Sequence, residues 1–229
     1  MDSEIERLAL QALNDLSLQP KGRRVIIGIA GVPGSGKTTL AANVAAKINN
    51  LYSTAKDAQI SDHDLAVAIP MDGFHYSRAH LAAMPNAEEA IHRRGAAFTF
   101  DGYGFLNLIE SLRAQAHQTM YAPSFGHEIK DPVPNSIPIP PESLIVLIEG
   151  NYCALDREPW RQAASLMTRL WYADTPAEVT HPRLAKRHLE SGIVGDEKEA
   201  WERATGTDER NARDIRENLL RVDEVIKPW

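Results

Sequence analysis

Residues 31–38 constrain this chain more than any other stretch. They read G-V-P-G-S-G-K-T and match G-x-x-x-x-G-K-[ST], in which backbone N–H groups cradle phosphates, Lys neutralises them and Ser/Thr ligates Mg²⁺. The β-branched run 25–30 precedes the loop, and an Ala-rich helical pattern follows it. This order sets a helix N-terminus against the phosphates. The residues predicted to bind a nucleotide are Gly31, Pro33, Gly34, Ser35, Gly36, Lys37, Thr38 and Thr39.

Length, charge and cysteine content restrict the class of protein. A chain of 229 residues suits one domain over residues 1–229, and a net charge of −6 argues against nucleic-acid binding. The single cysteine, Cys153, excludes an intramolecular disulfide and a thiolate zinc cluster. No apolar run reaches about 18 residues, and the acidic first residues do not resemble a basic signal peptide. We therefore expect no membrane contact and a cytoplasmic location.

Strand and helix patterns alternate along the chain. Apolar runs predict strands over residues 25–30, 65–70, 144–148, 169–173 and 222–226. Helical spacing predicts helices over residues 3–16, 104–117, 159–165 and 177–191, and a charged helical stretch, interrupted at Gly206, over residues 196–220. Residues 49–64 are predicted to be a loop, and six prolines exclude a long helix over residues 121–142. The alternation predicts an α/β fold, a parallel sheet with helices on both faces, whose ligands bind at the carboxyl ends of strands.

Four side chains have the chemistry that phosphoryl transfer needs. Asp72 directly follows the second predicted strand and can accept a proton from a hydroxyl; the alternative is a turn residue. Glu149 ends the third predicted strand and can reach Mg²⁺; the alternative is a cap or turn. Arg183 and Arg187 lie four residues apart on one helical face and can close over phosphates as a mobile lid; the alternative is a solvated basic face.

Four motifs in this order carry a family resemblance: G-V-P-G-S-G-K-T, M-D-G-F-H, L-I-E-G-N-Y and R-L-A-K-R-H. Over about residues 24–226 the chain resembles the P-loop kinases grouped with uridine kinase, phosphoribulokinase and bacterial-type pantothenate kinase. The resemblance implies a P-loop NTPase-type fold with a helical lid over about residues 181–210. It also implies that Asp72 is the general base and that Lys37, Arg183 and Arg187 are catalytic. Thr38 and Glu149 are implied to lie next to the metal ion.

The same resemblance points to an acceptor side. The segment P-S-F-G-H resembles the P-x-Y-x-H segment near the acceptor site of pantothenate kinases, which makes Phe125 and His127 candidates, although Phe stands where Tyr is expected. Arg93 and Arg94 are further acceptor-side candidates, with a surface or capping role as the alternative. His75 follows the predicted base by three residues and can orient a substrate; the alternative is a structural or exposed histidine.

The hypothesis from the sequence is a kinase that uses ATP and Mg²⁺ and transfers the γ-phosphoryl group to an alcohol. Its acceptor stays open among a nucleoside, a sugar or sugar phosphate, and a pantothenate-like acid, in part because His188 stands where uridine kinases commonly have Asp. The alternative is a nucleotide-dependent switch or slow NTPase; D-G-Y-G matches its D-x-x-G pattern, but no guanine-reading N-K-x-D occurs. The expected partner is a small-molecule acceptor, without nucleic acid or membrane, and a homodimer is an open option.

Overall fold

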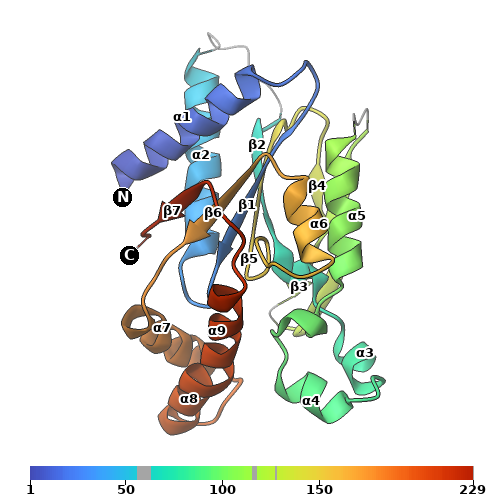
Figure 1. Ribbon diagram of the computed structural model, residues 1–229, viewed down its shortest axis with the longest axis vertical. Coiled ribbons are helices and arrows are strands. Elements are labelled where there is room, and N and C mark those ends of the chain that lie inside the picture. Colours follow the sequence, from blue (N-terminus) through green and yellow to red (C-terminus); the bar gives the residue numbers. More distant parts are fainter. Residues whose placement is uncertain (56–62, 115–117, 127, 229) are drawn as a thin grey trace.

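A five-stranded parallel sheet forms the centre of the molecule (Figure 1). The computed structural model describes residues 1–55, 63–114, 118–126 and 128–228. The strands lie in the order β2-β5-β1-β6-β7, and every neighbouring pair is parallel. Their bounds are β1 Val25–Gly31, β2 Ala66–Pro70, β5 Ile145–Gly150, β6 Arg169–Ala173 and β7 Glu224–Ile226.

Helices cover both faces of this sheet, as the apolar strand sequences require. Helices α1 (Asp2–Ser17) and α2 (Lys37–Ala55) pack on one face, and α5 (Gly102–Arg113) and α6 (Trp160–Ser165) pack on the other. Alternate residues of β1 pack into the two hydrophobic cores, one on each face of the sheet. Ile27 faces α1 and α2, whereas Ile26 faces α5 and α6. This arrangement confirms the predicted α/β class.

The carboxyl ends of the parallel strands meet at one edge of the sheet. Pro70 of β2 is in register with Glu149 of β5, which is in register with Ile29 of β1. The loop 32–36 leaves β1 at this edge, and a 3₁₀ turn, η1 (Met71–Phe74), leaves β2 there. The predicted phosphate loop, Asp72 and Glu149 therefore share one end of the sheet.

Two further units flank this edge, on opposite sides of it in Figure 1. On one side the chain forms α7 (Ala177–Glu190), α8 (Glu197–Arg203), the π-helical turn η3 (Ala204–Asp208) and α9 (Glu209–Glu217). The other side holds α3 (Arg78–Ala82), α4 (Ala87–His92) and η2 (Ala97–Thr99). The predicted interruption at Gly206 is the π-helical turn, which joins α8 to α9.

The proline-rich stretch forms an antiparallel hairpin of β3 (Met120–Gly126) and β4 (Asp131–Ile139). The hairpin lies against η1 so closely that a Cβ atom on Gly73 would meet the carbonyl oxygen of Pro123 at 2.2 Å. Only glycine fits such a backbone approach. The residue after Asp72 is thereby fixed against the hairpin.

The predicted loop over residues 49–64 is wrong for its first part, because α2 continues to Ala55. The side chain of Asn49 bonds both the N–H and the carbonyl of Ala66, at 2.8 and 3.0 Å, and so ties this part of the helix to β2. Leu51 and Tyr52 pack against the core below it. Residues 56–62, like residues 115–117 of the predicted helix 104–117, lie outside the described residues. None of the helices in the described ranges is long and apolar enough to cross a bilayer.

Candidate active site

The loop after β1 turns sharply before α2 begins at Lys37. Gly34 and Gly36 adopt positive φ values of 76° and 88°, a conformation that side chains disfavour, which explains the glycines of the motif. Ser35 is fully buried between them, and its Oγ has no hydrogen-bond partner among the described residues. The loop therefore wraps around a point directly in front of the N-terminus of α2, which is 19 residues long.

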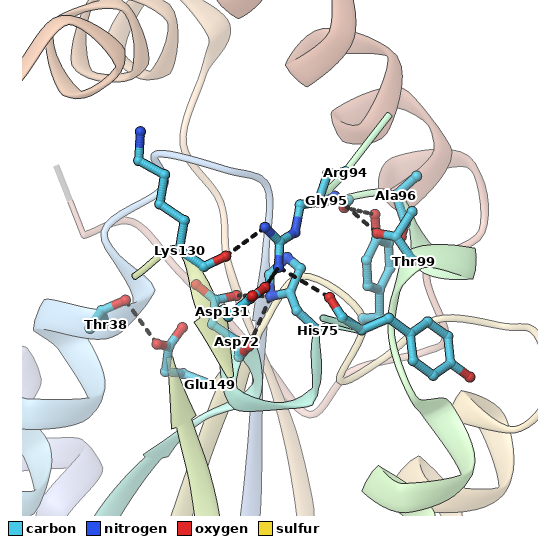
Figure 2. Close-up of polar contacts among 12 residues, drawn as sticks. Thr38, Asp72, His75, Arg94, Gly95, Ala96, Thr99, Lys130, Asp131 and Glu149 are labelled. Carbon is cyan, nitrogen blue, oxygen red and sulfur yellow. Dashed lines mark hydrogen bonds and ion pairs between the residues drawn. The ribbon is translucent and has the colours of Figure 1, made fainter. Parts of the chain in front are cut away.

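Thr38 and Glu149 meet at this point (Figure 2). The Thr38 hydroxyl donates a hydrogen bond of 2.9 Å to Oε1 of Glu149. Glu149 is only 6% exposed, and this burial raises the pKa of its carboxyl, while the positive charge of Lys37 opposes the rise. Burial likewise lowers the pKa of the Lys37 ammonium, and the negative charge of Glu149 opposes that fall. Each group thus stabilises the charged form of the other.

Asp72 lies beside this pair, in η1. Its negative charge acts on both Lys37 and Glu149, so the three groups share one electrostatic environment. Half of its side chain is exposed, at 51%, which leaves its carboxylate open to a ligand. Nδ1 of His75 lies 2.8 Å from the Asp72 carbonyl oxygen and must carry the proton of that bond, because a carbonyl only accepts. Burial lowers the pKa of His75, so the neutral ring presents Nε2 as an acceptor.

Helix α7 brings Arg183 and Arg187 to the phosphate loop. Nη1 of Arg183 lies 3.4 Å from the carbonyl oxygen of Gly34, which it contacts as a donor. The positive charge of Arg187 acts on the pKa values of both Lys37 and Glu149. The two arginines line a cavity of about 410 Å³, together with Gly34, Gly36, Lys37, Thr38 and Thr39. Loop and helix α7 therefore enclose one space.

On the other side of Asp72 lies an aromatic cluster. The His75 ring lies 3.8 Å from the ring of Phe100 and 5.1 Å from that of Phe125, centroid to centroid. The Arg94 guanidinium lies 5.5 Å from the Phe125 ring centroid. Three candidates for the acceptor side, His75, Arg94 and Phe125, thus lie together.

Arg93, another candidate, does not join this cluster. Arg93 points to another part of the surface, where its guanidinium lies 5.6 Å from the ring of Phe98 and its Nη2 lies 3.4 Å from Oδ1 of Asn211. His127 lies outside the described residues.

Sequence reasoning missed the hairpin turn that holds Arg94. Arg94 donates to the Lys130 carbonyl at 2.6 Å and to Oδ1 of Asp131 at 3.0 Å (Figure 2). The same Asp131 oxygen accepts a hydrogen bond of 2.8 Å from the Arg78 backbone N–H. No motif marks Lys130 or Asp131, because their role depends on a contact across 36 residues that only the folded hairpin makes.

The donor set at the phosphate loop fits a magnesium ion. Thr38 and Glu149 offer hard oxygen atoms, and within the described part of the chain no group of three or more His, Cys, Asp or Glu residues could hold a metal by itself. Mg²⁺ is commonly held by one or two carboxylates together with substrate phosphates and water. The buried thiol of Cys153 is 1% exposed, and burial raises its pKa, so it is neither a ligand nor a nucleophile here.

Comparisons with known proteins agree with this geometry. A model of the "Phosphoribulokinase / Uridine kinase family" matches residues 26–190. The "ATP-dependent kinase-like protein notR'" of Aspergillus versicolor is 50% identical over 159 residues, 68% of this chain and 92% of that protein. The "Putative uridine kinase C227.14" of Schizosaccharomyces pombe is 38% identical over 205 residues, 90% of this chain and 83% of that protein.

A solved structure has the same fold over nearly the whole chain. The crystal structure of YFH7 from Saccharomyces cerevisiae superposes with a TM-score of 0.86 at 24% identity, covering 97% of this chain and 98% of the other. The match to the family model and the identity to the fission yeast protein each extend over more than two thirds of the chain. The chain therefore belongs to the phosphoribulokinase and uridine kinase family of P-loop kinases.

Proposed function

We propose that this protein transfers the γ-phosphoryl group of ATP to a hydroxyl group of a small metabolite, with Mg²⁺. The observation that carries the proposal is the convergence of Lys37, Asp72 and Glu149 within one electrostatic environment at the edge of the sheet. A phosphate loop alone supports binding or hydrolysis. An exposed carboxylate beside it supplies what transfer to an alcohol needs in addition.

In this reaction the loop N–H groups and Lys37 hold the β- and γ-phosphates of ATP. The Asp72 carboxylate takes the proton of the acceptor hydroxyl as that oxygen bonds to the γ-phosphorus. The bond between the γ-phosphorus and the β–γ bridging oxygen breaks, and ADP leaves with the electron pair. Arg183 and Arg187 stabilise charge on the migrating group and exclude water. Thr38 and Glu149 would hold Mg²⁺, and the bound ion would supply electrostatic stabilisation of the phosphates.

The acceptor classes that this site supports are nucleosides, sugars or sugar phosphates, and pantothenate-like polyol acids. His75 and Phe125 would form an aromatic wall beside Asp72, and Arg94 would add a positive charge behind it. Phe125 offers a ring face and no hydroxyl, so it favours recognition by packing rather than by a hydrogen bond. The names of the relatives do not transfer an acceptor to this chain.

The experiment is a coupled ADP-release assay with MgATP and a panel drawn from these acceptor classes. We expect one class to stimulate ADP release, and Asp72→Asn to reduce that stimulated rate by about 10² or more while ATP still binds. The matched control is Asp156→Asn, which changes a surface carboxylate paired with Arg161 and should leave the rate unchanged.

Two outcomes would contradict the proposal. Stimulation that survives in Asp72→Asn would place the base elsewhere. ADP release that no acceptor increases, with tight ATP binding, would favour the alternative of a nucleotide switch or slow NTPase.

A further inference from the structure

A second cavity, of about 670 Å³, lies away from the phosphate loop. It opens between the segment 93–103, the start of α6 and one face of α9. Neither the loop 31–39 nor Asp72, Glu149, Arg183 or Arg187 contributes to its lining, and it shares no lining residue with the cavity over the phosphate loop. It is therefore separate from the cavity over the phosphate loop, although it shares Phe100 with the aromatic cluster around His75 and its lining includes the candidate Arg93.

One wall of this cavity is a charged helix face. Arg210, Arg213, Asp214 and Glu217 of α9 all line it, and their spacing of three and four residues puts them on one side of the helix. Asp214 is already paired, since its two oxygens accept from Arg157 at 2.8 and 3.2 Å. Arg210 and Arg213 form no hydrogen bond or ion pair with any residue that the structure describes. Two guanidinium groups thus face the cavity without a protein partner.

A third guanidinium approaches from the opposite wall. Nε of Arg93 is buried and has no partner among the described residues, whereas its Nη2 contacts Asn211 at 3.4 Å and its Nη1 pairs with Glu89 at 3.7 Å. Among the lining residues, four arginines face three carboxylates, in a protein whose net charge is −6. The cavity is thus a positive site on an acidic protein, and it favours an anion.

The rim of the cavity is aromatic. Phe98 and Tyr103 are 38% and 68% exposed, which is high for large rings, and Phe100 and Trp160 are buried beneath them. Arg93 already lies near the face of Phe98. Exposed rings beside unpaired guanidinium groups suit a flat ligand that carries a negative group.

We propose that this second cavity binds a small organic anion with an aromatic ring. Its anionic group lies against Arg210 and Arg213, and its ring packs on Tyr103 and Phe98. Such a ligand contacts both α9 and the segment that carries Arg94; α9 follows α8 and α7, the helix that carries Arg183 and Arg187. The site does not depend on the reaction proposed above.

The test uses 1-naphthyl phosphate as a probe of this chemistry, titrated into the full chain by isothermal calorimetry at fixed ionic strength. We expect saturable binding to one site that persists in Lys37→Ala and in the presence of saturating MgATP. The double variant Arg210→Ala/Arg213→Ala should weaken it by about tenfold or more, and so should replacing the probe by neutral 1-naphthol. Tyr103→Ala, at a largely exposed position, should weaken it without affecting folding.

The control double variant is Lys198→Ala/Arg221→Ala, which removes two positive charges from exposed positions outside the cavity. Equal loss in this control would show that overall charge alone attracts the probe, and would overturn the proposal. Displacement by MgATP, or loss of binding in Lys37→Ala, would place the probe at the phosphate loop and overturn it as well. Absence of saturable binding of 1-naphthyl phosphate to the wild-type chain would also overturn the proposal.

Discussion

At the scale of single residues, the candidate site depends on charges that are held out of water. Glu149 is nearly inaccessible, and Lys37 is the positive charge that most strongly opposes the rise of its pKa on burial. Removing either one leaves the other buried and uncompensated. A pair of this kind is costly to maintain, which favours a role in ligand binding over one in stability alone.

Glu149→Gln should raise the Mg²⁺ concentration needed for half-maximal ATP binding by about 10- to 100-fold. The pH dependence has a definite sign. Burial holds the folded pKa of Glu149 above its ordinary value, so acidification protonates this carboxylate early and weakens Mg²⁺-supported binding as the pH falls through that raised pKa.

The measurement is a set of ATP titrations at several Mg²⁺ concentrations and pH values. The protonation of ATP itself is common to both proteins, so the difference between their profiles reports Glu149. Identical profiles would contradict its assignment to the metal side.

At the scale of elements, α7 is held against η3 and α9 on one side and lies against the phosphate loop on the other. His188 is 4% exposed, and its Nε2 lies 2.6 Å from Oδ2 of Asp208 in the π-helical turn. His181 contacts Glu209 at 3.0 Å in the same way. These contacts fix α7 against η3 and α9, while Arg183 and Arg187 extend toward the loop.

Arg187→Ala should lower kcat by about 10²-fold or more and change ATP affinity little, since its charge matters most in the transition state. Lys186→Ala is the matched control, because the Lys186 side chain is 77% exposed and, among the residues that the structure describes, pairs only with Glu190. Steady-state kinetics, with ATP binding measured separately, would test this role of Arg187. Unchanged turnover in Arg187→Ala would exclude it from the reaction.

Asp208→Ala should loosen α7 by about 1 to 3 kcal/mol, because His188 then stays buried without a partner at Nε2. Hydrogen exchange of the α7 amides, compared with that of β1, measures this local effect. Glu202→Ala, which breaks only a surface pair with Lys198, should leave exchange unchanged. Equal exchange in wild type and Asp208→Ala would show that the pair does not fix the helix.

Sequence patterns predicted the elements whose signals are local. Apolar runs mark β1 and β5, and the spacing of Gly34 and Gly36 marks the turn between β1 and α2. Each of these was predicted at the correct place. The predicted end of α2 was wrong because Asn49 bonds a strand residue 17 positions away. This tertiary contact overrides the polar local sequence that indicated a loop. The pairing of β3 with β4 was not predicted, since six prolines conceal the alternation of a hairpin. Arg94 was predicted and its partner Asp131 was not.

At the scale of the whole molecule, distant segments fix the first helix to the sheet. Asp15 of α1 is 6% exposed and forms a two-atom ion pair with Arg169 of β6, one contact of which is 2.7 Å. Near the other end of the helix, Arg7 contacts Glu224 of β7 at 3.1 Å. Helix α1 thus stabilises the edge strand β7, because the three residues of β7 alone would pair only weakly with the sheet.

Asp15→Asn should lower the free energy of unfolding by about 2 kcal/mol, because Arg169 keeps a charge that has lost its buried partner. Urea unfolding at pH 7 measures the change. Asp2→Asn, at an exposed position of the same helix, should change stability by no more than about 0.5 kcal/mol. Equal stability of Asp15→Asn and wild type would show that packing alone holds α1.

The close approach of Gly73 to Pro123 divides the hairpin into two parts with different freedom to change. At Pro123, in the middle of β3, the backbone contact leaves no room for a side chain on Gly73, so a substitution of Gly73 would move the neighbouring Asp72. Beyond it, Phe125 contacts His75 through its ring, and the backbone carbonyl of Lys130 accepts a hydrogen bond from Arg94. If Asp72 accepts the proton as proposed, acceptor specificity can therefore be changed by substitutions at Phe125 while Asp72 stays in place.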